Sequence, residues 1–360
     1  MQATRRQVLG FRIRAQQLDR TSGSVEDTTV LDLGVQDTGA DGGLWALALR
    51  GVSAPSADEL ATVWTLRGAP HLDRRSDLPT IAAATAPFSD ADAGKRIFDA
   101  AKPLKAAGIP NLAALDTVAG AMRSIVTGPM VKGEMSTRLT AVLDPPYLRN
   151  CVPCGAIHSH EQTFRLAALR AGLELQPGTS PPVLRPIPVF RPAAEVPERF
   201  DVVRAYLRLL GPATPKLVAG YLDAPAKDVQ AHWPDDAVEV QVDGERRWLL
   251  SDDIDRLEDP PEVTRLLAPF DLFLQARDRP LLVADPALAK DLWRMLGRPG
   301  GVLVDGEIVG TWRARKAGSG LAVTVGLWTP VAADIRQAIG EQAERLAAFR
   351  KSTLATVAVE

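Results

Sequence analysis

VEVQVDGERRWLL, residues 238–250, is the stretch that indicates the fold most clearly. Two runs with alternating apolar residues, the pattern of strands, flank Asp243-Gly244. Asp-Gly in that position predicts a β-hairpin, because a type I′ turn needs positive φ at both central residues. Three helices are predicted before the hairpin, near residues 201–210, 215–222 and 225–233. Helices followed by a hairpin are the outline of a winged-helix unit.

The same outline is predicted at the start of the chain. Thr4 to Gln7 form a capping box that opens a helix, and Asp41 is placed to cap a second helix over residues 42–50. Two strand-like runs follow, at residues 62–67 and 71–75, joined by the turn Gly68-Ala69-Pro70. This hairpin, the first wing, carries arginine at its tip and edge.

A further copy is predicted between these two. Helices are expected over residues 97–109, 112–126 and 132–142, and the extended chain after Cys154 would supply a wing. The proline-rich stretch 177–197 is the best linker candidate.

The end of the chain differs from the repeated outline. Asp305-Gly306 predicts another hairpin, residues 321–325 a strand, and residues 334–350 a closing helix. We therefore predict an α+β protein with three tandem winged-helix units, residues 1–90, 91–190 and 198–262, followed by a small β-rich C-terminal domain, residues 263–360.

Composition restricts the protein class. The chain has 360 residues, of which 46% are hydrophobic and 24% charged, so it can build sizeable cores. No apolar run reaches the roughly 18 residues of a membrane span, and the N-terminus lacks the apolar block of a signal peptide. Two cysteines do not suggest a disulfide scaffold. We expect a cytoplasmic protein that does not bind membranes.

The net charge of −2 hides an uneven distribution. The first twenty residues hold five arginines, Arg12 and Arg14 among them, against one aspartate. A second basic cluster lies at residues 95–105, whereas residues 235–262 are strongly acidic. Basic surfaces are what duplex DNA requires, although each cluster is equally compatible with ordinary solvated surface.

Cys151, Cys154, His158 and His160 contain the donor types of a tetrahedral zinc site. Their spacing is compressed, because zinc fingers normally separate the two ligand pairs by about a dozen residues. We therefore expect no metal here, and we interpret these residues as structural.

Other enzyme motifs are missing from the sequence. It has no G-x-S-x-G nucleophile elbow, no P-loop and no G-x-G-x-x-G after a strand. We therefore expect neither a serine or cysteine hydrolase nor a nucleotide cofactor, and no cofactor of any kind.

Several short motifs, taken in order, resemble one family. They are the first helix, LGVQDT at residues 33–38, LRGAPHL at 66–72, GPAT at 211–214, PFD at 269–271 and VDGEIVGTWR at 304–313. This series resembles the AlkZ/YcaQ-type winged-helix DNA glycosylases, which unhook crosslinked or bulky alkylated purines. The resemblance implies winged-helix units around a concave channel for DNA, with the catalytic motif in the first unit.

The family motif is Gln-x-Gln or Gln-x-Asp, just before a recognition helix. Gln36 matches its first position, and Thr38 stands where the family has the second Gln or Asp. By resemblance, Gln36 would orient a water molecule, with Thr38 assisting and the adjacent Asp37 contributing. The alternative interpretation is that Gln36 and Asp37 only hydrogen-bond a turn before the helix.

The resemblance predicts a monomeric, monofunctional glycosylase that acts on alkylated or crosslinked purines in duplex DNA without base flipping. It would be a protein of the bacterial cytoplasm that is associated with the nucleoid when bound to DNA. The residues expected to contact DNA are those of the first wing and first helix: Arg67, His71, Arg74, Arg75, Arg12 and Arg14. The alternative is a non-enzymatic DNA-binding protein or regulator that has lost the catalytic pair. Both alternatives require duplex binding.

Overall fold

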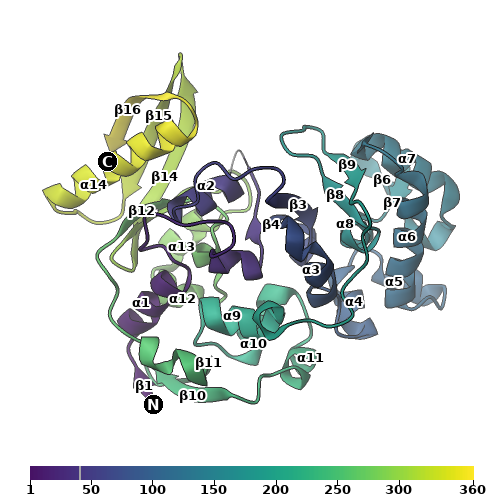
Figure 1. Ribbon diagram of the computed structural model, residues 1–360, viewed down its shortest axis with the longest axis horizontal. Coiled ribbons are helices and arrows are strands. Elements are labelled where there is room, and N and C mark those ends of the chain that lie inside the picture. Colours follow the sequence, from purple (N-terminus) through teal and green to yellow (C-terminus); the bar gives the residue numbers. More distant parts are fainter. Residues whose placement is uncertain (40–41) are drawn as a thin grey trace. The chain divides into compact units, whose positions relative to one another are not determined.

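The computed structural model describes residues 1–39 and 42–360, and it confirms an α+β protein (Figure 1). The chain forms two compact units. The first comprises Met1–Pro55, Tyr206–Leu217 and Pro234–Glu360, and the second comprises Ser56–Ala205 and Val218–Trp233. Each unit thus combines segments that are distant in the sequence. The division into four domains remains a prediction.

The first unit contains most of the strands. Its elements are β1 Gln2–Ala3, α1 Arg5–Ala15, β2 Val35–Gln36, α2 Gly42–Leu49, β10 Ala237–Val242, β11 Glu245–Leu250, β12 Thr264–Leu267, α12 Arg279–Leu282, α13 Pro286–Leu292, β13 Gly300–Val304, β14 Glu307–Ala317, β15 Gly320–Leu327, α14 Ala333–Phe349 and β16 Thr353–Val359. Helices α9 Val202–Leu210 and α10 Pro215–Leu222 have residues in each unit.

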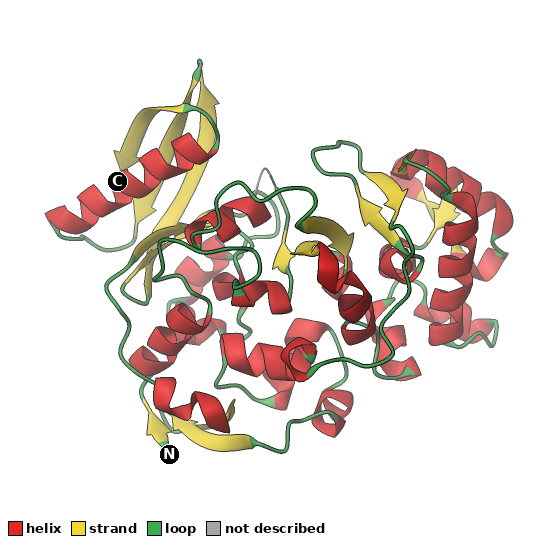
Figure 2. Ribbon diagram, viewed as in Figure 1, coloured by secondary structure: helices red, strands yellow, loops and turns green. Residues whose placement is uncertain are grey.

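A five-stranded sheet in the order β12-β13-β14-β15-β16 dominates the last hundred residues. Its strands are antiparallel except for β15 and β16, which run parallel. Helix α14 contacts β12, β15 and β16, and it lies along the sheet in Figure 2. The strand predicted at 321–325 and the helix predicted at 334–350 are both confirmed.

The two Asp-Gly hairpins are confirmed. Strands β10 and β11 pair from Ala237 with Leu250 to Val242 with Glu245. Between them, Asp243 and Gly244 have φ of 49° and 85°, as a type I′ turn requires. Asp305 and Gly306 join β13 and β14 in the same way.

Helix α1 begins with the predicted capping box. Thr4 Oγ1 accepts the backbone N–H of Gln7 at 3.2 Å, and Gln7 Oε1 accepts the backbone N–H of Thr4 at 2.9 Å. Two donors without intrahelical partners are thereby satisfied. Burial of this helix extends beyond its apolar stripe. Arg12 is buried together with Phe11 and Ile13.

The second unit is mainly helical. Its elements are β3 Leu60–Trp64, β4 Pro70–Arg74, α3 Leu78–Ala84, α4 Asp90–Arg96, α5 Ala101–Ala106, α6 Asn111–Ile125, β5 Met130–Val131, α7 Lys132–Val142, β6 Leu148–Cys151, β7 Ala156–Ser159, α8 Glu161–Arg170, β8 Leu173–Leu175, β9 Val183–Pro186 and α11 Ala226–Ala231.

Within this unit, β4, β3, β8, β9 and β5 lie side by side in that order, and β6 and β7 form a separate hairpin. Helices α6 and α8 pack together over an apolar core that includes Val118, Met122 and Phe164. The helix predicted at 132–142 has the observed bounds of α7. The helix predicted over 97–109 is shorter in the structure. Only α5, Ala101–Ala106, lies within that range, and the preceding helix α4 ends at Arg96.

Among the described residues, no helix combines the length and apolar character needed to cross a membrane.

Candidate active site

Gln36 and Thr38, the first and third residues of the motif, lie together at the end of β2. Nε2 of Gln36 donates to Oγ1 of Thr38 at 3.0 Å. Residues two apart in an extended chain point to the same side, which allows this contact. Both residues are half-buried, so they combine a defined position with access from outside.

Asp37, between them, contacts the helix that follows. Its Oδ1 accepts the backbone N–H of Gly43 at 3.0 Å, in the first turn of α2. A carboxylate there satisfies a donor that has no intrahelical partner and interacts favourably with the helix dipole. Asp41, expected as the cap of this helix, lies outside the described residues. The structure thus gives Asp37 a contact that positions α2.

Helix α2 is held firmly in the first unit. Nε1 of Trp45 donates to the Leu266 carbonyl at 2.7 Å, and the Trp45 ring contacts that of Phe349. Arg50, just after the helix, makes a bidentate ion pair with Asp271 at 2.8 and 2.9 Å, and both side chains are fully buried. Removing one partner of such a buried pair costs about 3–5 kcal/mol. The motif therefore precedes a helix that is anchored through Trp45 and Arg50.

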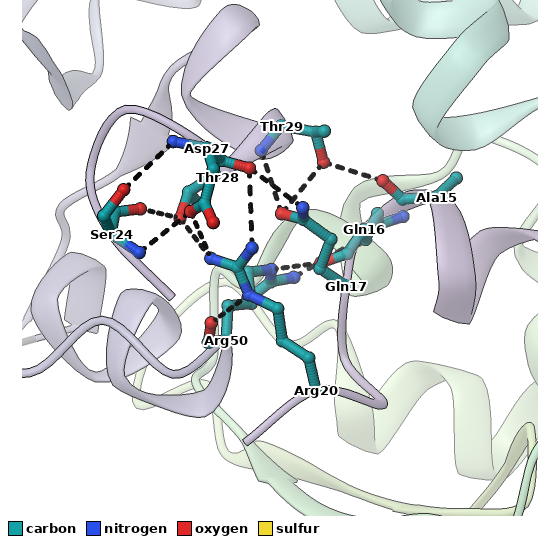
Figure 3. Close-up of polar contacts among 9 residues, drawn as sticks. All are labelled: Ala15, Gln16, Gln17, Arg20, Ser24, Asp27, Thr28, Thr29 and Arg50. Atoms are coloured by element: carbon teal, nitrogen blue, oxygen red, sulfur yellow. Dashed lines mark hydrogen bonds and ion pairs between the residues drawn. The ribbon is translucent and has the colours of Figure 1, made fainter. Parts of the chain in front are cut away.

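The loop after α1 also supports α2 (Figure 3). Nε of Arg20 donates to the Arg50 carbonyl at 2.6 Å, and its Nη2 contacts Asp27 at 3.0 Å and Thr28 at 2.7 Å. Arg50 in turn donates to the Gln16 carbonyl at 2.8 Å. These bonds connect the end of α1, the loop and the end of α2.

Arg12 does not belong to the predicted DNA-contacting surface, whereas the predicted contact of the half-buried Arg14 with DNA stays a prediction. Arg12 is 0% exposed and makes a bidentate ion pair with Asp278 at 3.0 and 2.7 Å. Arg247 bonds the same carboxylate. Burial raises the pKa of Asp278, but the charges and hydrogen bonds of Arg12 and Arg247 lower it by more, so the net shift of the pKa is downward. Arg14 donates to the backbone carbonyls of residues 258 and 259. The prediction for Arg12 is therefore wrong, because its charge is neutralised inside the protein.

The first wing is confirmed as the hairpin of β3 and β4, but His71 and Arg74 do not face solvent. His71 is 0% exposed, with Nδ1 at 2.9 Å from both Thr65 Oγ1 and the Ala69 carbonyl. Burial, with the Arg67 charge, lowers the pKa of His71 to about 3, so the ring is neutral. Arg74 is buried and pairs with Asp77 at 3.3 Å. Neither residue can contact a phosphate in this conformation.

Arg67 and Arg75 are half-buried and bound within the second unit. Arg67, with φ of 60°, donates to the Tyr221 carbonyl at 2.9 Å and stacks on the Tyr221 ring. Arg75 pairs with Glu174 at 2.9 Å and donates to the backbone of the neighbouring strand. Both side chains thus have partners within this unit, and their predicted contact with DNA stays a prediction.

Comparison with known proteins identifies the family. The sequence profile described as "DNA glycosylase AlkZ-like" matches residues 33–349, most of the chain. The chain belongs to the AlkZ-like DNA glycosylase family. Among solved structures, Streptomyces sahachiroi DNA glycosylase AlkZ matches with a TM-score of 0.76 and 22% identity, over 100% of each chain. That similarity shows a shared fold. No curated protein sequence matches the chain.

In this AlkZ-like chain, the hairpin of β14 and β15 carries exposed cations that the sequence reasoning missed. Arg315 and Lys316 are exposed near the turn at residues 317–320, and the described part of the chain offers them no ion-pair partner. The available signal was the pair of glycines, Gly318 and Gly320, directly after a basic strand. These two side chains are able to contact phosphates.

Asp73, on β4, is a buried titratable residue of this family member. It is 1% exposed, and its Oδ2 has no hydrogen-bond partner among the described residues. Burial and the nearby Asp77 raise the pKa of Asp73 to about 7, while Arg74 opposes the shift. Asp73 thus holds its proton at a pH where an exposed aspartate is ionised.

The Cys and His residues lie on the hairpin of β6 and β7. Donor atoms of Cys151, Cys154 and His158 all lie within 4.8 Å of one another. The pKa of Cys151 is lowered to about 7 by hydrogen bonds with Cys154 and His158. His160 is outside the group and is buried at the start of α8. The short spacing therefore does not prevent three of the four donors from converging.

Proposed function

We propose that the chain is a monofunctional DNA glycosylase that hydrolyses the N-glycosidic bond of alkylated or crosslinked purines in duplex DNA. The observation that carries the proposal is the Gln36–Thr38 contact at 3.0 Å in the motif position of an AlkZ-like chain. The similar Streptomyces protein is named as a DNA glycosylase, which supports the same reaction class.

The chemistry requires little from the protein. An N7-alkylated guanine is cationic, so its bond to C1′ of deoxyribose is already weak. Water adds to C1′, the bonding electron pair leaves with N9 and neutralises the purine, and the water proton passes to solvent, leaving an abasic site. Gln36 would hold this water by its side-chain carbonyl, and preorganised polar groups would favour the positively charged sugar.

Thr38 would complete the water site. A hydroxyl that accepts the Gln36 amide still has its own proton to donate. Thr38 therefore orients water without acting as a base. Asp37 has one carboxylate oxygen bound to Gly43, so its contribution is to place α2 and thereby the motif.

The residues after the motif offer room for a substrate. Gly39 has φ of 88°, and side chains rarely adopt that conformation. A Cβ placed on Gly39 or Gly42 would meet no described atom within 4 Å. This space supports close approach of a nucleotide to Gln36.

DNA binding completes the proposal. We assign backbone contacts to Arg315 and Lys316, which are exposed, in place of the buried Arg12, His71 and Arg74. The order of helices and hairpins along the chain is compatible with three winged-helix units. The family resemblance implies that such units enclose a channel for DNA, in which case a monomer would suffice. A crosslinked base cannot be swung out of the helix, so the lesion would be approached without base flipping.

The direct test is incubation with duplex containing N7-methylguanine, followed by alkali to cleave abasic sites. Strand cleavage at the modified guanine, absent from unmodified duplex, is expected. Binding without cleavage on any alkylpurine duplex would instead favour the non-enzymatic DNA-binding protein, an alternative supported by Thr38 in place of a second amide or carboxylate.

A further inference from the structure

The hairpin of β6 and β7, in the second unit, brings two thiols and one imidazole together. Donor atoms of Cys151, Cys154 and His158 lie within 4.8 Å of one another. Both cysteines are free, Cys154 is exposed, and Cys151 and His158 are half-buried. The group is therefore accessible from solvent without rearrangement.

The backbone explains the convergence. Cys151 is the last residue of β6 and is paired with Ala156. His158 lies two residues beyond Ala156, so it is the diagonal cross-strand neighbour of Cys151 on the same face. Residues 152–154 form one 3₁₀ turn that ends at Gly155, with φ of 60°. This turn returns Cys154 to the other two donors.

The imidazole is oriented as in many metal sites. Nδ1 of His158 donates to the Ser159 carbonyl at 2.8 Å, which leaves Nε2 as the nitrogen with a lone pair. Metal-bound histidines usually donate their second ring N–H to a carbonyl or carboxylate in this way. The fourth candidate, His160, leaves the hairpin face because it begins α8.

We propose that Cys151, Cys154 and His158 bind one Zn²⁺ ion, with a non-protein ligand such as water in the fourth position. Two thiolates and one imidazole are a donor set that Zn²⁺ accepts in three-ligand sites. Binding replaces both thiol protons, which pass to solvent. This proposal replaces the expectation of no metal, which was drawn from ligand spacing. The pairing of β6 with β7 and the turn between them bring the three donor atoms together despite the short spacing. It does not depend on the proposed glycosylase activity.

The test uses tag-free, full-length protein that is reduced, stripped with chelator and then titrated with Zn²⁺ or Co²⁺. We expect one equivalent to bind, and Co²⁺ to give the thiolate charge-transfer and visible bands of a tetrahedral site. Cys154→Ser and His158→Ala should each weaken binding at least about tenfold. Val152→Ala, an exposed position between the cysteines, should bind like wild type.

Amide hydrogen exchange is a second measurement, which distinguishes the loss of a zinc ligand from misfolding of a variant. Zinc should slow amide exchange in residues 148–159 of the wild type but not of Cys154→Ser. Reduced wild type that binds no metal, or Cys154→Ser that retains one equivalent, would overturn the proposal. Thiols that form only a Cys151–Cys154 disulfide, without metal binding after reduction, would overturn it as well.

Discussion

Nε2 of Gln36 donates a hydrogen bond to Oγ1 of Thr38 across 3.0 Å, so the two side chains form one unit at the end of β2. This bond orients the Gln36 amide. Its nitrogen is directed to Thr38, so its carbonyl oxygen is directed away from Thr38. In the proposed mechanism, Thr38 would therefore act through Gln36 as well as on water.

Replacing Thr38 tests that dependence. Thr38→Val keeps the shape but removes the acceptor for Gln36, and we expect single-turnover excision of N7-methylguanine to fall about tenfold, less than for loss of Gln36 itself. Thr38→Ser keeps a hydroxyl and should stay near wild type. Equal excision by the valine and serine variants would show that the Thr38 hydroxyl has no role.

Asp37 tests whether a carboxylate is needed. Asp37→Asn keeps an oxygen that can accept the Gly43 N–H, but it removes the charge. We expect excision within a few-fold of wild type, because Asp37 positions α2 rather than accepting a proton. The same single-turnover assay applies, with circular dichroism to confirm folding. A loss of about a hundredfold or more in a folded variant would identify Asp37 as a general base.

Asp73 should make stability depend on pH. Its folded-state pKa of about 7 is above the ordinary value of 3.8, so the folded protein holds a proton that the unfolded chain releases. Its contribution to stability is full below 3.8 and is lost as the pH rises to about 7. This loss is on the order of 4 kcal/mol.

Asp73→Asn removes that dependence, because an amide does not titrate. Urea unfolding gives the free energy of unfolding of both proteins. The value of the variant minus that of wild type should be larger at about pH 8 than at about pH 5. His71, with its lowered pKa, acts in the opposite direction below pH 6.5 in both proteins, so the difference between them isolates Asp73. If the free energies of unfolding of wild type and Asp73→Asn differ by the same amount at about pH 5 and at about pH 8, Asp73 titrates normally.

Duplex binding should depend on salt, since phosphate contacts release counterions. Replacing Arg315 and Lys316 with glutamine should weaken binding and reduce the slope of log Kd against log salt by about 2. Arg336→Gln, an exposed arginine on α14, serves as the control. Binding measured by fluorescence anisotropy at about 50 to 200 mM salt checks this. An unchanged slope in the double variant would exclude the β14–β15 hairpin from the DNA interface.

Local sequence signals predicted the elements well. The capping box at Thr4 and the Asp-Gly turns at residues 243–244 and 305–306 act over a few residues, and all three are present. The Gln36–Thr38 contact was likewise within reach, because residues two apart in an extended segment share a side.

Burial of charged residues was not predictable in the same way. Arg12 is neutralised by Asp278, which lies 266 residues away in the sequence, and Arg50 by Asp271, 221 residues away. No local pattern distinguishes such arginines from those of a DNA-binding surface. His71 was misassigned for a related reason, since a short alternating run does not reveal which face of a hairpin is covered.

Ligand spacing did not predict that the donor atoms of Cys151, Cys154 and His158 converge. Typical zinc-finger spacings describe ligands on separate elements, whereas here both strands of one hairpin and its turn supply the donors. Only the strand register shows that residues seven apart become diagonal neighbours.

The central claim is that Gln36 orients the attacking water. Its most direct test is single-turnover excision of N7-methylguanine from duplex DNA by wild type and Gln36→Ala, with duplex affinity measured alongside. We predict a loss of roughly a hundredfold or more in excision with little change in affinity, because phosphate contacts supply most of the binding. Equal excision by the two proteins would contradict the claim.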